Sequence, residues 1–197
     1  MNKIAFILLM ACPLIGSTQD NSVKEDQKIH LFIGYDLGEA VFNKFQSLSG
    51  EIGVRFKNNH TLRLVHMNVK LTEQHLSSSF AGAVDGPNVE GKMFGFEAFY
   101  DIPILWKSLY VAPSVGYFEN GYNHIILSEE LKNNSATIGA AISYRETNVF
   151  GIKGLYTTLS LPMRITLNPL KETILGETTI VNNSFDNNIW FFIGFEF

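Results

Sequence analysis

The chain has 197 residues, a single cysteine, a formal net charge of -4 and an aromatic content of 13%. One cysteine excludes a disulfide framework and a thiolate metal site. The mild negative charge, with no basic block, excludes nucleic acid as an expected partner. The length suits one domain.

The N-terminus predicts a secretory signal peptide over residues 1–18. Met1-Asn-Lys3 is a short basic start, and Ile4–Ile15 is an apolar run followed by small and polar residues. This run is too short for a membrane helix, which needs about 20 apolar residues. Cleavage is expected after Ser17 or Thr18. An alternative remains open, because Leu9-Met-Ala-Cys12 resembles a lipoprotein signal in which Cys12 would be acylated.

Residues 28–197 are expected to form one domain of eight strands, preceded by a short segment over residues 19–27. Each candidate strand alternates apolar side chains with other types at the period of two that a strand requires. Most span roughly ten residues, the length of a tilted strand in a membrane. In chain order they cover about 28–42, 51–57, 61–72, 92–102, 108–119, 135–146, 154–166 and 187–197.

The alternation assigns each strand an outer, lipid-facing side and an inner side. In most strands the outer set is plainly apolar, as with Phe94 and Phe96 against Glu97. For residues 61–72 the expected outer set is Val65, Met67, Val69 and Leu71, and the expected inner set is Leu64, His66, Asn68 and Lys70.

The C-terminal strand carries an apolar face and ends on a phenylalanine. Soluble chains usually end in polar, exposed residues, whereas this pattern suits a barrel whose outside contacts lipid. The stretch resembles the terminal signature of bacterial outer-membrane β-barrels. That resemblance implies a strand that closes the barrel and is recognised by the barrel-assembly machinery. The apolar positions are Ile189, Phe191, Ile193, Phe195 and Phe197.

The connections alternate in length, which predicts short periplasmic turns and long external loops. The short links are residues 58–60, 103–107 and 147–151, and the long ones are 77–91, 120–134 and 168–186. Ten strands remain an alternative, because Thr173–Leu175 and Thr179–Val181 flank Gly176-Glu177 and could pair. We expect that hairpin to extend above the membrane.

Taken together, the mature chain resembles the small outer-membrane barrels related to OmpA and OmpX. Residues 99–117 resemble the PorT-type barrels more narrowly, although Ala112 stands where those proteins usually have glycine. The resemblance implies an all-β, antiparallel, up-and-down transmembrane β-barrel in the bacterial outer membrane. It implies little about chemistry, since fold does not determine function.

Charges of nearly balanced sign fall on the predicted inner side. An eight-stranded barrel has an interior just wide enough for side chains, and an unpaired buried ion costs several kcal/mol. We therefore expect these charges to pair and close the interior; the alternative is a narrow polar channel, as in a small pore or a transport or secretion accessory. The expected interior network comprises Asp36, Glu51, Arg55, His66, Lys70, Glu97, Asp101, Arg145, Arg164 and Glu196.

The sequence predicts a non-enzymatic protein without metal or cofactor. Its histidines are scattered and show no metal spacing. His75-Leu-Ser77, near Glu73, resembles the His-x-Ser arrangement of lipid A deacylases and supplies the third alternative, a lipid-modifying enzyme. The expected role is structural or surface interaction, with outer-membrane lipid around the barrel. An external ligand or protein would bind at the long loops.

Overall fold

The computed structural model describes residues 28–43, 45, 47–77, 83–104, 106–181 and 184–197. The predicted signal peptide, Cys12 and the segment 19–27 lie outside these residues. Eight strands form a closed antiparallel ring in the order β8-β12-β1-β2-β3-β5-β6-β7, and β7 pairs with β8 to complete it. This confirms the prediction of an all-β, up-and-down barrel of eight strands.

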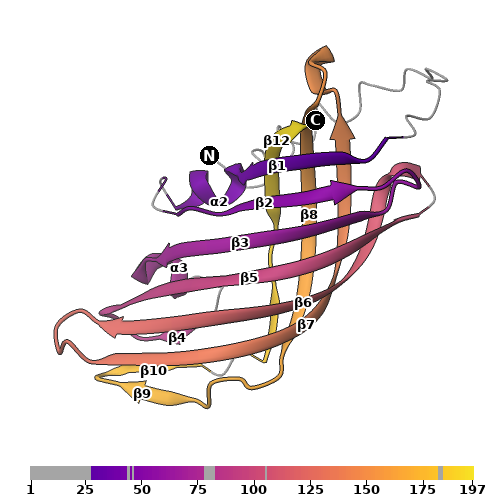
Figure 1. The fold of residues 1–197 in the computed structure, drawn as a ribbon. Helices are drawn as coiled ribbons and strands as arrows, with labels where there is room; N and C mark the ends of the chain where they lie inside the picture. The colour runs from indigo at the N-terminus through magenta and orange to yellow at the C-terminus, as the bar shows by residue number, and fades with distance from the viewer. Residues whose placement is uncertain (1–27, 44, 46, 78–82, 105, 182–183) are drawn as a thin grey trace.

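The two ends of the barrel differ (Figure 1). β1 begins and β12 ends at one end, which we call the terminal end; there residues 56–60 and 148–154, with the 3-10 turn η2 (Val149–Gly151), make short connections. The opposite end, which we call the mouth, carries the longer connections that follow β1, β3 and β8, together with a short turn between β6 and β7. The ring consists of β1 (His30–Asp36), β2 (Gly50–Arg55), β3 (Thr61–Leu71), β5 (Val89–Ile104), β6 (Trp106–His124), β7 (Glu130–Thr147), β8 (Leu155–Thr166) and β12 (Trp190–Glu196).

A second, three-stranded sheet lies outside the ring at the mouth. It contains β4 (Val84–Asp85), β10 (Thr178–Ile180) and β9 (Thr173–Leu175), next to the ends of β6 and β7 in Figure 1. With the short helix α3 (Glu73–Leu76) it forms a unit that we call the cap. The predicted hairpin over residues 173–181 therefore exists and stays out of the ring, as expected. The cap has its own apolar core of Leu76, Val84, Val89, Leu175 and Ile180.

The predicted first strand is too long. β1 ends at Asp36, and α2 (Leu37–Phe42) replaces the expected strand over residues 37–42. The Asp36 carboxylate accepts a hydrogen bond from the Glu39 backbone N–H at 3.1 Å. Aspartate at this position satisfies a helix N–H that has no partner within the helix, so the chain turns into a helix there.

Two predicted long loops are shortened by strands that extend into them. β6 continues to His124 and β7 begins at Glu130, so a turn over residues 125–129 replaces most of the loop expected over 120–134. β5 likewise begins at Val89, inside the loop expected over 77–91. Strand pairing satisfies backbone groups whatever the side chains are, so polar composition alone does not end a strand.

The predicted inner and outer sides are confirmed in every strand except β3. There the assignment is inverted: Val65, Met67 and Val69 are buried in the barrel, whereas Leu62 and Leu64 are 48% and 39% exposed. Both sides of this strand are apolar over part of its length, so alternation alone could not orient it. Pairing with β2 and β5 does so, and it places Arg63 inside.

Apolar and aromatic side chains fill the barrel between its charged groups. The cluster contains Val65, Met67, Val69, Phe99, Ala112, Phe118, Ala141, Trp190 and Phe192. No helix in the described part of the chain is long and apolar enough to cross a membrane.

We predict that Gly194→Val destabilises the closing pair of strands. Gly194 faces Gly34 across the β1–β12 pair, and a Cβ at Gly194 would lie 2.2 Å from the Ile33 carbonyl oxygen and 2.7 Å from the Tyr156 hydroxyl. Overpacking of this kind costs about 1–3 kcal/mol. Urea unfolding in detergent micelles should show that loss. Gly121→Val is the matched control, because the nearest atom to its Cβ is 3.9 Å away; equal losses in both variants would contradict the prediction.

Candidate functional site

The interior charges gather around one arginine from β3. The Arg63 Nε lies 2.9 Å from an Asp101 carboxylate oxygen, and its Nη1 donates to Glu51 at 3.2 Å. Its Nη2 donates to the hydroxyls of Ser143 at 3.1 Å and Ser160 at 3.2 Å. The Arg63 and Glu51 side chains are fully shielded from solvent. One guanidinium thus contacts strands β2, β5, β7 and β8.

Glu51 connects a second arginine to this group. Its other carboxylate oxygen accepts from Arg145 Nη2 at 3.2 Å and from the Tyr156 hydroxyl at 3.0 Å. Arg145 also donates to Thr158 at 3.0 Å. We call Glu51, Arg63, Asp101, Arg145 and Tyr156 the central cluster. It places two cations against two carboxylates, so its charges balance.

A second group, the mouth cluster, lies toward the mouth and consists of Glu97, Arg164 and Asp186. Arg164 Nε lies 3.1 Å from Glu97, and its Nη1 lies 3.1 Å from Asp186. Ser114 donates to the second Glu97 oxygen at 2.7 Å. The mouth cluster therefore has two carboxylates for one guanidinium.

A third group, the terminal cluster, lies at the terminal end. Arg55 on β2 makes a two-point contact with Glu196 on β12, with its Nε donating at 3.0 Å, and His30 Nδ1 lies 3.6 Å from the same carboxylate. Arg55 also donates to Asn59 at 3.0 Å. The Arg55 side chain is 20% exposed, so this pair is closer to solvent than the central cluster.

Aromatic rings lie against the buried guanidinium groups. The Arg63 guanidinium carbon is 4.3 Å from the centre of the Phe99 ring, and that of Arg145 is 4.2 Å from the centre of the Phe32 ring. Arg164 lies 4.9 Å from the centre of the Trp190 ring. A cation over a desolvated ring gains about 2 kcal/mol, so the rings both fill space and stabilise the charges.

The structure brings most of the expected network together, in three clusters. Asp36 is the exception inside the barrel, because its carboxylate caps α2. His66 and Lys70 do not belong to the network: β3 turns them outward, where His66 stacks on Phe94 and Phe96 and Lys70 pairs with Glu90 at 3.3 Å. Lys70 lies near the mouth, opposite Lys92, where outward positions become charged.

Sequence reasoning missed Arg63, the most connected of these residues. Its neighbours Leu62 and Leu64 give the one signal that could have found it. If both leucines contact lipid, the residue between them points inward, and a charged residue at that position needs a partner.

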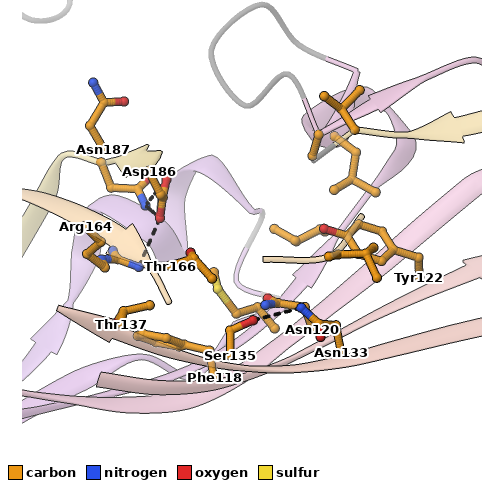
Figure 2. Close-up of a pocket in the computed structure, with 17 residues that line it drawn as sticks. Phe118, Asn120, Tyr122, Asn133, Ser135, Thr137, Arg164, Thr166, Asp186 and Asn187 are labelled. Carbon is orange, nitrogen blue, oxygen red and sulfur yellow. Dashed lines mark hydrogen bonds and ion pairs between the residues drawn. The ribbon is translucent and has the colours of Figure 1, made fainter. Parts of the chain in front are cut away.

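A cavity of about 140 Å³ lies between the barrel core and the cap (Figure 2). Its floor includes Phe118, Thr137 and Arg164, and Tyr122 and Leu76 contribute from the cap side. We call it the mouth cavity. It lies at the mouth, on the side of the expected ligand-binding region at the loops.

The residues of the His-x-Ser alternative lie on and just after α3. The Ser77 hydroxyl donates to the Glu73 carbonyl at 2.9 Å, and the His75 side chain lies outside the described residues. Within the described residues, no group of three or more histidine, cysteine or acidic side chains could hold a metal ion.

The positions expected to act as the C-terminal assembly signal face outward, with Ile189, Phe195 and Phe197 52%, 49% and 71% exposed.

We predict that Arg63→Met lowers the free energy of unfolding by about 3–5 kcal/mol, because Glu51 and Asp101 would lose a buried cation. Urea unfolding in micelles measures this. Arg55→Met should cost less, since its pair is partly exposed. Adding Glu51→Gln and Asp101→Asn to Arg63→Met should recover part of the loss. Equal losses for the two single arginine variants would contradict this account.

We also predict a pH effect at α2. Burial, with a smaller contribution from the Asp36 charge, raises the pKa of Glu39 from its ordinary 4.5 to about 7. The folded chain then binds this proton more tightly than the unfolded chain, so stability falls as pH rises from about 4.5 through 7. Glu39→Gln should flatten that fall, and raise stability at pH 8 by about 1–2 kcal/mol. Exposed Glu129→Gln is the control; urea unfolding at pH 5 and pH 8 that leaves the Glu39→Gln slope unchanged would contradict the assignment.

The chain was compared with known proteins. No protein-family model matches it, and no curated protein does. Among solved structures it is similar to the N-terminal β-barrel domain of Pseudomonas aeruginosa OprF, with 14% sequence identity and a TM-score of 0.39. The match covers 88% of this chain and 100% of that chain.

Proposed function

We propose that the protein is an integral outer-membrane barrel, closed to ions, with a structural or surface-interaction role and no catalytic activity. The observation that carries the proposal is the inverted polarity of the barrel. Its charged groups are buried inside, and its outward positions are large, apolar and exposed. The exposed set includes Leu31, Ile33, Ile52, Leu62, Leu64, Phe94, Phe96, Tyr100, Val115, Tyr117, Ile138, Ile142, Leu161, Met163, Ile165 and Phe195.

This set surrounds the barrel rather than forming one patch. It draws on every strand of the ring. A soluble monomer rarely exposes contiguous apolar patches of more than a few hundred Å², and a surface of this kind is stable where lipid replaces water. A closed ring also leaves no unpaired strand edge, which is the requirement for strands in a lipid environment.

The distribution of outward charges supports one orientation. Toward the mouth the outward positions of β3, β5, β6 and β7 become charged at Lys70, Lys92, Glu119 and Lys132. Short turns and both ends of the ring lie at the opposite side, as they do on the periplasmic side of such barrels. The mouth then faces the outside of the cell, and β12 with its terminal aromatics is the element that the assembly machinery recognises.

The buried clusters favour a closed interior and argue against a pore. The central cluster spans the barrel with side chains that are nearly inaccessible to solvent, and its charges balance. A conducting lumen would need water beside these groups. A lipid-modifying role would need a Ser–His pair; among the described side chains, the Ser77 hydroxyl donates to the Glu73 carbonyl.

Membrane fractionation of cells that express the full chain tests the location. We expect the protein in the outer membrane, with faster gel migration before heating than after, because a folded barrel resists detergent. Gly121→Val should behave in the same way, and Gly194→Val should show less of the folded form. Recovery of the native chain as a soluble periplasmic protein would overturn the proposal.

Planar-bilayer recordings test the closed interior. The purified barrel should give no reproducible current steps, and Arg63→Met should give more frequent ones if it folds. Steady steps on the order of hundreds of picosiemens from the native protein would overturn the closed interior, because only a water-filled lumen would conduct so well. They would leave the membrane location standing and favour the pore.

A further inference from the structure

We propose that the mouth cavity binds one uncharged six-membered sugar ring, either free or as the terminal unit of a glycan. The cavity lies between two separate apolar cores, those of the barrel and the cap, and neither core fills it. The proposal concerns a site that the structural role does not require, and it stands or falls independently of the location of the protein.

Two buried polar groups on the cavity floor lack partners. Arg164 is 2% exposed and Thr137 is 6% exposed. The Arg164 Nη2 and the Thr137 hydroxyl have no hydrogen-bond partner among the described residues. Thr137 on β7 pairs with Thr166 on β8, and Thr166 is the next inward residue after Arg164 along β8. Thr137 and Arg164 are therefore diagonal neighbours. A buried donor without a partner costs about 1–3 kcal/mol, which a ligand oxygen at this point would remove.

The charges around Arg164 determine which oxygen fits. Glu97 and Asp186 already lie 3.1 Å from its guanidinium, so the mouth cluster carries one more carboxylate than cation. An anionic ligand would meet that excess charge, and an ammonium group would have no acceptor for the free Arg164 N–H. A hydroxyl group is uncharged, accepts a hydrogen bond from Arg164 and can donate one to Asp186, so it fits where an anion or an ammonium group does not.

The rest of the wall matches a ring with one polar and one apolar side. Amide and hydroxyl groups of Asn120, Asn133 and Ser135 extend the polar side along β6 and β7. Leu76 and Tyr122 present apolar surface, and in Figure 2 Tyr122 lies on the opposite side of the view from Arg164, Thr137 and Asp186. A sugar ring carries hydroxyls around its edge and C–H groups on its faces, so it can satisfy both walls.

The volume suits a single ring. About 140 Å³ is close to the roughly 150 Å³ of an engineered cavity that holds benzene. A ligand of about a dozen heavy atoms that gains about 0.3 kcal/mol per atom binds with a Kd on the order of 1 mM. The binding assay must therefore detect weak complexes.

Methionine methyl groups report on the site directly. Met93 lines the cavity, whereas Met163 lies on the outer surface and is 41% exposed. The full barrel, labelled with carbon-13 at the methionine methyls in micelles, is titrated with glucose, galactose and mannose and with their methyl glycosides. At least one sugar should shift the Met93 signal saturably and leave Met163 unchanged. A shift by methyl glycosides as well as free sugars indicates a terminal glycan unit, and a shift by free sugars alone indicates a monosaccharide.

Two pairs of variants locate the site. Thr137→Val removes one floor hydroxyl and should weaken binding about tenfold, since a lost hydrogen bond of this kind is worth about 1.4 kcal/mol. Ala83→Leu adds bulk to the cavity lining and should abolish binding. Thr157→Val and Ala140→Leu make the same changes on the outer face and should bind like the native chain. Gel migration before heating verifies that each variant is folded.

Three results would overturn the proposal. The first is a Met93 signal that no neutral sugar shifts saturably up to about 50 mM, well above the expected Kd. The second is a shift by glucuronate, titrated alongside the neutral sugars, when none of those sugars shifts the signal; this would indicate an anion site. The third is native affinity in folded Thr137→Val and Ala83→Leu.

Discussion

The buried guanidinium of Arg63 is the constraint on which the interior depends. It reaches Glu51 on β2, Asp101 on β5 and two serine hydroxyls on β7 and β8. Each carboxylate in this cluster would be costly to bury alone, and Arg63 would be equally costly without them. The cluster is therefore stable only when strands from opposite sides of the ring are in register. A local error in one strand would leave a charge unpaired at the centre of the barrel, so the cluster links strand pairing to closure.

The same constraint explains why the barrel has its polarity inverted. Once the charges occupy the inside, the alternating side chains between them must point outward, and these are mostly leucine, isoleucine, valine and phenylalanine. Several of the aromatic residues that remain inside, among them Phe32, Phe99 and Trp190, lie against guanidinium groups. Close packing leaves space for little besides hydrogen at some positions: the Tyr156 hydroxyl occupies the place of a side chain at both Gly34 and Gly194. Interior charge, outer apolar surface and glycine at the closing strands are parts of one arrangement.

The mouth is packed differently from the barrel interior, because the cap has its own apolar core. The cap buries Val84, Val89 and Ile180 against one another, separately from the barrel residues below. Where two independently packed cores meet, a space remains between them, and the mouth cluster lies beside that space with an unused donor. The central cluster satisfies nearly all of its groups internally and supports the structure. The mouth cluster has both unsatisfied groups and room, which are the two conditions for binding a small molecule.

Alternation along the chain was sufficient to identify eight strands, their closure into a ring and the inner side of seven of them, because a period of two depends only on local backbone geometry. It placed Glu51, Glu97, Asp101, Arg145 and Arg164 on the inner side, where the structure has them buried. Alternation could not orient β3, because Leu62 and Leu64 make one face apolar and Val65 and Met67 make the other face apolar as well. It also could not predict that Asp36 caps a helix. The register of β3 against β2 and β5 fixes which face of β3 points inward. A hydrogen bond from the Glu39 backbone N–H to Asp36 makes Asp36 the helix cap. The architecture can be read from the amino-acid sequence, because the same local pattern repeats in strand after strand. Which charges meet and where the cavity lies cannot, because both depend on contacts between strands far apart in sequence.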